Sequence, residues 1–173
     1  MKRIVVFFLI ILYSLSYSQN RISDSLKLAL KSAKHDTIKC KILHELVQLR
    51  DDEDIWPIYN EQLKQLSEKK LYTCKDAYLY KFYNKYLANS LNDLGFLFFN
   101  QGEFSKAEDY FFKSLTIREK IEDKSGIIES FTNLAALYNN RGDISKARYY
   151  QIKQLEFCKK TTMKNAYPHL FLI

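Results

Sequence analysis

The sequence is poor in residues that interrupt helices and in those that build common catalytic sites. Its 173 residues include only 4 Gly, 2 Pro and 3 His. So few Gly and Pro argue against linker-rich chains and against a β-protein with many tight turns. The sequence contains no P-loop, no Gly-rich dinucleotide turn and no paired Cys motif. We therefore predict a protein without enzymatic activity, cofactor, metal ion or small-molecule substrate.

Positive charge is not concentrated in any part of the chain. The net charge of +7 comes from 21 Lys and 6 Arg, interleaved with 20 Asp and Glu. Proteins that bind nucleic acids concentrate positive charge on one face and favour Arg for bidentate contacts. The pattern favours a solvated helical surface, so a nucleic-acid partner is not expected.

Cysteine is also scarce. Cys40, Cys74 and Cys158 are far apart in the sequence, and each lies in or beside a segment with a helical pattern. An odd number leaves at least one thiol unpaired or paired with another molecule. Cys commonly packs as a small apolar residue, so no disulfide scaffold is expected. Cys40 and His44 stand at i and i+4, but they lack the second pair of ligands that a metal site needs.

The first 18 residues have the three-part layout of a secretory signal peptide. A positive start precedes an apolar run over residues 4–12, and Ser16 and Ser18 then place small side chains before Gln19. This pattern predicts cleavage before Gln19 and export to the periplasm or the cell exterior. The apolar run is shorter than the roughly 20 residues that span a bilayer. An uncleaved inner-membrane anchor is the alternative, and it is the only membrane contact that we expect.

An internal repeat of 40 residues predicts the fold. Residues 91–98 align with 131–138, and residues 100–107 align with 140–147. In each copy, apolar residues at i, i+3 and i+7 indicate a first helix, which Gly then ends in a left-handed conformation. A hairpin of two such helices cannot bury both apolar faces by itself, so it must stack on a neighbour. The repeat therefore predicts an all-α solenoid of antiparallel helix pairs.

Small residues stand where the two helices of each hairpin face one another. Gly95 and Ala135 lie on the first helices, and Ala107 and Ala147 lie on the second. Acidic and hydroxyl side chains suit the start of a second helix. Those present there are Glu103, Ser105, Asp143 and Ser145.

These residues resemble the tetratricopeptide repeat. The first copy contains the two motifs Leu91-x-x-Leu94-Gly95-x-x-Phe98 and Ala107-x-x-x-Phe111. Leu91 stands where the family often has Trp, and the second copy departs at Gln151, where an aromatic residue is expected. The period exceeds the usual one of about 34 residues. It is similar to the long-linker variety found in exported sensory regions of bacterial histidine kinases, in which residues 117–126 would extend the second helix and join it to the next unit.

The resemblance implies a right-handed α-solenoid that binds a protein or peptide and catalyses no reaction. In this family, first-helix residues one place after the leading apolar positions line a concave groove for peptide segments. The positions that carry over are Asn92, Phe96, Phe99, Asn100, Thr132, Ala136, Asn139 and Asn140. Asn can donate to and accept from a peptide backbone, and exposed Phe offers apolar contact area. Each of these residues is otherwise an ordinary exposed helix residue.

The rest of the chain has helical patterns of lower specificity. We expect a helix over residues 22–33, a second capped by Asp36, an acidic turn at 51–54 and a third over 55–70 with Pro57 in its first turn. A long helix is expected to begin near Asp76. The predicted parts are a signal peptide (1–18), N-terminal helices with a degenerate repeat (19–71), two repeat units (72–122 and 123–160) and an irregular C-terminal tail (161–173).

Two functions follow from these features. The first is a non-catalytic scaffold for protein interaction, exported from the cytoplasm. The alternative is a truncated sensory domain of a histidine kinase or transcriptional regulator, because an apolar tail such as 167–173 does not solvate the open end of a solenoid.

Overall fold

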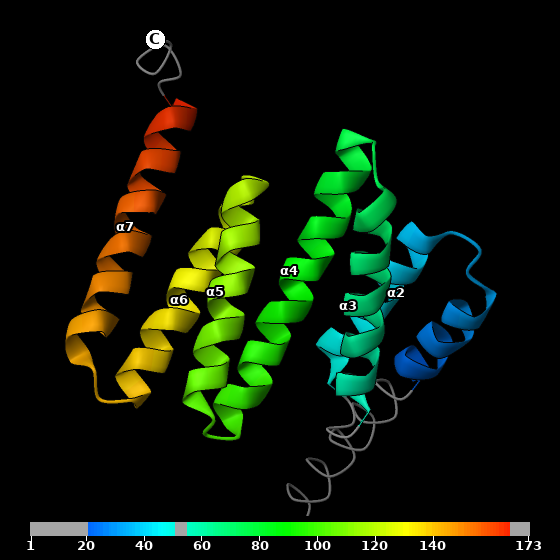
Figure 1. Ribbon diagram of the computed structural model, residues 1–173, viewed down its shortest axis with the longest axis horizontal. Helices are drawn as coiled ribbons and strands as arrows, with labels where there is room; N and C mark the ends of the chain where they lie inside the picture. The colour runs from blue at the N-terminus through cyan, green and yellow to red at the C-terminus, as the bar shows by residue number, and fades with distance from the viewer. Residues whose placement is uncertain (1–20, 51–54, 167–173) are drawn as a thin grey trace, which may run out of the picture. The chain divides into compact units, whose positions relative to one another are not determined.

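The scarcity of Gly and Pro gives a chain that is helical almost throughout its described part. The computed structural model describes residues 21–50 and 55–166, with side chains described as far as residue 162. A helical segment covers residues 21–32. It is followed by α2 (Asp36–Leu49), α3 (Trp56–Thr73), α4 (Ala77–Asn100), α5 (Phe104–Lys120), α6 (Lys124–Asn140) and α7 (Ile144–Ala166), as Figure 1 shows. The described residues contain no strand, so the all-α prediction is confirmed.

Three expectations concern residues that the structure does not describe. The predicted signal peptide (1–18), the acidic turn (51–54) and the last seven residues of the predicted tail (167–173) all lie outside the described residues. Residues 161–166 of that tail are helical, because α7 continues to Ala166. The prediction that residues 161–166 are irregular is therefore wrong. No helix among the described residues is both long enough and apolar enough to cross a membrane.

The chain divides into two compact units between Ser67 and Glu68, inside α3. In the first unit, α2 buries Leu43, Leu46 and Val47. Cys40 is completely buried, and its Sγ lies 4.0 Å from the Oγ of Ser67. Cys40 therefore packs as a small core residue, as the sequence predicts.

The starts of the N-terminal helices agree with prediction, with one error in capping. His35 occupies the N-cap position of α2 without a side-chain hydrogen bond, and Asp36 is the first helical residue. The predicted Asp36 cap is wrong; its carboxylate lies 3.6 Å from the Nζ of Lys39 instead. Asp76 does cap α4, since its Oδ1 accepts a hydrogen bond from the amide of Leu79 at 2.7 Å.

In the second unit, α4, α5, α6 and α7 lie in a row, with α5 packed on α4, α6 on α5 and α7 on α6 (Figure 1). The two hairpins repeat the same aromatic contact. Phe98 stacks on Tyr110 with ring centroids 5.4 Å apart, and 40 residues later Tyr138 stacks on Tyr150 at 5.5 Å. The core of this unit comprises Ala107, Phe111, Leu115, Ile127, Phe131, Leu134, Leu137, Tyr138 and Ala147. The sequence repeat is therefore a structural repeat.

The turns between these helices share one geometry. Gly102 and Gly142 have φ of 77° and 78°, in the left-handed region. In each turn the next amide bonds back to the helix before it, as from Glu103 to the carbonyl of Phe98 at 2.9 Å. The turn between α5 and α6 has the same bonds around Glu122, a non-Gly residue with φ of 57°. The expected linker over 117–126 is thus a continuation of α5 to Lys120 and one tight turn.

The second helices begin as expected in one hairpin only. The Oδ1 of Asp143 accepts a hydrogen bond from the amide of Lys146 at 3.0 Å at the start of α7. Glu103 occupies the N-cap position of α5 without a side-chain hydrogen bond, and its carboxylate pairs with Lys106 instead. Ser105 and Ser145 lie inside the first turns of these helices and do not begin them.

Candidate functional site

The predicted binding residues all lie on α4 and α6, but the surroundings of several differ from those expected. α4 and α6 are the first helices of the two hairpins, and they contact one another. Two groups of side chains stand out on the surface formed by α4 and α6. The polar group comprises Asn92, Glu129 and Asn133. The aromatic group comprises Phe96 and Phe99, near the end of α4.

Asn92 is buried and holds α4 against α6. Its Nδ2 donates to the Oε1 of Glu129 at 3.0 Å, and its Oδ1 accepts from the Nδ2 of Asn133 at 2.8 Å. Only 6% of Asn92 is exposed. The expectation that Asn92 is free to bind a peptide backbone is therefore wrong, because both its donor and its acceptor already have partners.

Arg118 of α5 lies beneath this polar group. Its side chain is 1% exposed, and its Nη2 lies 2.9 Å from the Oε2 of Glu129. The same guanidinium donates to the carbonyl of Gly126, the hydroxyl of Ser130 and the Oδ1 of Asn89, at 2.9, 2.8 and 3.3 Å. The Glu129 carboxylate is 52% exposed, so this network brings one partly exposed carboxylate to the surface between α4 and α6.

Gly126 makes room for the buried guanidinium. A Cβ at residue 126 would stand 2.7 Å from the Cδ of Arg118. Sequence reasoning missed Arg118 because a basic residue in the last turn of a helix is ordinarily solvated. It also missed Asn89, Glu129 and Asn133, for which the only signal was their helical spacing beside the predicted positions.

The aromatic residues of the surface are partly buried. The rings of Phe96 and Phe99 stack with centroids 6.4 Å apart, and Phe99 also contacts Phe104 of α5 at 5.8 Å. Phe99 packs against the core of the repeat unit. The expectation that both rings are exposed is therefore corrected: each offers part of its surface, and the remainder supports the hairpin.

The remaining predicted residues are exposed. Thr132 accepts a hydrogen bond from the Nε2 of Gln154 in α7 at 2.9 Å. Asn140 donates to the carbonyl of Ala136 in its own helix at 3.0 Å. Asn139 lies on the exposed side of α6, and Asn100 ends α4.

A buried tyrosine lies at the other end of α6. The hydroxyl of Tyr138 donates to the Oε1 of Glu108, whose Oε2 pairs with Arg141. Burial raises the pKa of Tyr138 above its usual range, and the hydrogen bond to Glu108 raises it further. Burial also raises the pKa of Tyr150, with smaller contributions from Tyr149 and Glu108. Both phenols are neutral at physiological pH, and the hydrogen bond from Tyr138 to Glu108 holds α6 against α5.

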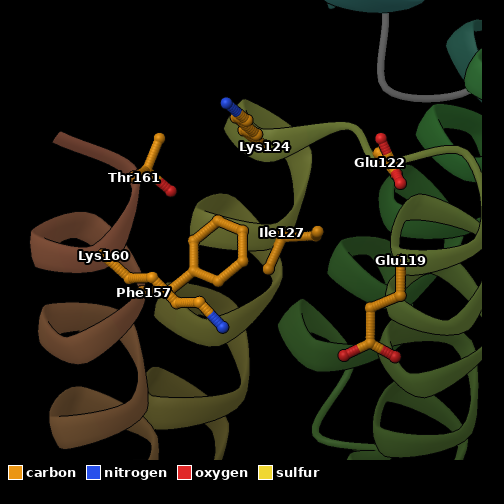
Figure 2. Close-up of a pocket in the computed structure, with 7 residues that line it drawn as sticks. All are labelled: Glu119, Glu122, Lys124, Ile127, Phe157, Lys160 and Thr161. Carbon is orange, nitrogen blue, oxygen red and sulfur yellow. The ribbon is translucent and has the colours of Figure 1, made fainter. Parts of the chain in front are cut away.

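A pocket of about 480 Å³ opens where the end of α5, the start of α6 and the end of α7 come together (Figure 2). Figure 2 shows Ile127 and the ring of Phe157 on its apolar side, with charged side chains around them. Its lining residues are Glu119, Glu122, Lys124, Ile127, Phe157, Lys160 and Thr161. These residues offer apolar contact and charges of both signs, and they include no His or Cys. Among the described residues, no group of three or more His, Cys, Asp or Glu is placed to hold a metal ion.

The arrangement defines a helical-repeat protein. Residues 86–160 match the sequence model of the tetratricopeptide repeat family, which confirms the resemblance for that part of the chain. This stretch runs from near the middle of α4 into α7 and contains both turns with left-handed glycines. Tetratricopeptide repeats generally mediate interactions between proteins. A sequence comparison with curated proteins gives no match.

Proposed function

We propose that this chain is a scaffold that binds a segment of another protein along the first helices of its repeats, α4 and α6. The observation that carries the proposal is the family match over 86–160 together with the side chains exposed on α6. Ala136 and Asn139 lie three residues apart there and therefore share one face of the helix. A peptide on this face would find amide groups for its backbone and the partly exposed rings of Phe96 and Phe99 for its apolar side chains.

The polar network gives this surface a defined position for a charged or amide group of the ligand. Glu129 is held by Arg118 and Asn92, so its carboxylate is fixed before any partner arrives. A preorganised group loses less conformational entropy on binding than a free side chain. Peptides with a donor group at the matching position, such as Lys or a backbone amide, are expected to bind best.

A peptide-display selection on the full chain tests the proposal. Selected peptides are expected to lose binding when Ala136→Arg places a long charged side chain on the face of α6. Thr116→Arg is the matched control, because Thr116 is exposed on α5 and does not belong to this surface. Equal binding of the selected peptides to Ala136→Arg, Thr116→Arg and the parent chain would show that they do not bind on α4 and α6.

We further propose that the chain is exported, with residues 1–18 removed before Gln19. The support is the charged start, apolar run and serine pattern of the sequence. Expression of the full gene product, followed by cell fractionation and N-terminal sequencing, tests this directly. A product that retains Met1 and stays in the cytoplasmic fraction would contradict export, and one that retains Met1 in the membrane fraction would indicate the anchored alternative.

A further inference from the structure

The last described helix carries apolar side chains that no described helix covers. Within the described part of the chain, α7 packs on α6 alone, at the end of the row of four helices (Figure 1). Ile152 and Leu155 of α7 are 49% and 55% exposed. Arg148 lies four residues before Ile152 and Lys159 four residues after Leu155, so these four residues share one face of the helix. We call this set the α7 face.

The 40-residue repeat shows what the α7 face corresponds to in the preceding hairpin. Leu155 is equivalent to Leu115 of α5, which is only 7% exposed. Leu115 belongs to the same core cluster as Ile127 of α6, and α6 packs directly on α5. The α7 face is therefore the position at which a further helix packs if it follows the arrangement of α6 on α5.

Charge on the α7 face is reversed relative to α5. The carboxylate of Glu108 in α5 accepts a hydrogen bond from the hydroxyl of Tyr138 and forms an ion pair with Arg141. Both partners lie at the end of α6. Arg148 is the equivalent of Glu108, and Lys159 is the equivalent of Glu119. α7 as a whole has six basic residues and a single acidic one. A further helix could pack on α7 in the same way as α6 packs on α5. It would then lie against Arg148, whereas α6 lies against Glu108.

We propose that the α7 face binds an amphipathic helix of another protein, one that carries acidic side chains beside its apolar stripe. A second copy of this chain is a poor occupant, because two α7 faces bring like charges together. Residues 167–173 are equally unsuited by charge, because they contain no Asp or Glu. This surface lies on α7 and does not depend on the surface proposed for α4 and α6.

The repeat itself supplies a sharp probe. A fluorescent synthetic peptide of residues 124–141, the parent peptide, reproduces α6. The same peptide with Arg141→Glu is called the acidic peptide. It places a carboxylate opposite Arg148 if it packs on α7 as α6 packs on α5. The full chain is expected to bind the acidic peptide about tenfold more tightly than the parent peptide, as measured by fluorescence anisotropy, and to lose affinity as salt increases. The chain variant Arg148→Glu is expected to invert this preference.

Two further variants separate the α7 face from general charge effects. Lys85→Glu makes the same charge change at an exposed position of α4 and is expected to leave the preference unchanged. Leu155→Ala removes apolar contact and is expected to weaken binding of the acidic peptide several-fold. Circular dichroism checks that each variant keeps the helical content of the parent chain.

Several results would overturn the proposal. Equal affinity for the two peptides, or a preference that Arg148→Glu does not change, would mean that the α7 face does not select an acidic helix. Binding to phosphatidylserine vesicles that depends on Arg148, without any peptide preference, would assign the face to a membrane surface. Dimerisation that Leu155→Ala abolishes, or peptide binding that occurs only after deletion of residues 167–173, would assign it to a second copy or to that segment.

Discussion

The ring of Phe111 in α5 occupies the space that a side chain on Gly95 in α4 would need. A Cβ built on Gly95 would stand 2.6 Å from both Cδ1 and Cε1 of Phe111. One repeat later both residues of this contact differ. Ala135 stands in place of Gly95, and the exposed Gln151 stands in place of Phe111. The two positions therefore vary together within one chain: a buried ring requires Gly, and its absence permits Ala.

Gly95→Ala is expected to destabilise the protein by about 1–3 kcal/mol, because the buried Phe111 ring must move. The sign is informative, since Ala in place of Gly inside a helix would otherwise stabilise by about 1 kcal/mol. Urea denaturation of the variant measures the change in free energy of unfolding. Adding Phe111→Leu should make Gly95→Ala less costly than it is in the parent chain; additive effects of the two substitutions would contradict the close contact.

The turn at Glu122 offers a stabilising substitution. A left-handed backbone costs a non-Gly residue about 1–2 kcal/mol, and part of the gain from relieving it is lost through the greater freedom of Gly in the unfolded chain. Glu122→Gly is therefore expected to raise the free energy of unfolding by about 0.5–1 kcal/mol. Gly142→Ala, at the equivalent turn with φ of 78°, is expected to lower it by a similar amount. A thermal-shift comparison in which both substitutions act in the same direction would contradict this account.

Features that depend on local sequence were predictable. The turns at Gly102 and Gly142, the start of α4 near Asp76 and the small residue at Gly95 each follow from what one residue type can do at one place in a helix or turn. The 40-residue register then related the two hairpins. The start of α2 was predicted one residue too late, because an Asp36 cap was expected and His35 occupies the N-cap position.

Contacts between distant residues were not predictable in the same way. Asn92 has the right spacing to face a ligand, but Glu129 and Asn133, 37 and 41 residues further on, engage its amide. Arg118 lies in the last turn of α5, where a basic side chain is ordinarily solvated, but contacts with α6 bury it. A single sequence indicates on which face of a helix a residue lies. It does not show which distant side chains form hydrogen bonds with that residue.

Arg118→Lys is expected to destabilise the protein by about 1–3 kcal/mol, although the charge is kept. The flat guanidinium reaches four acceptors at once, and an ammonium group on a shorter chain cannot replace that fork. Arg148→Lys is the matched control, since Arg148 is exposed on α7 and should change stability by less than about 0.5 kcal/mol. Equal unfolding midpoints in urea for the two variants would mean that the buried network contributes nothing beyond its charge.

The buried phenol of Tyr138 predicts a specific weakness at high pH. Its pKa in the folded protein is raised by burial and by Glu108, whereas an unfolded chain ionises Tyr near pH 10. Above about pH 10 the unfolded state releases this proton and the folded state retains it, so the free energy of unfolding falls as pH rises. Below that pH the tyrosine is neutral in both states, and stability does not depend on it.

Tyr138→Phe is therefore expected to have a shallower loss of stability between about pH 10 and 11.5 than the parent chain. Some loss will remain, because the pKa of Tyr150 is raised as well. Tyr72→Phe, at a side chain that is 92% exposed, should follow the parent chain throughout. Urea denaturation at a series of pH values measures the three slopes. If Tyr138→Phe and the parent chain lose stability in parallel, the Tyr138 proton does not link folding to pH, and its pKa is not raised in the folded protein.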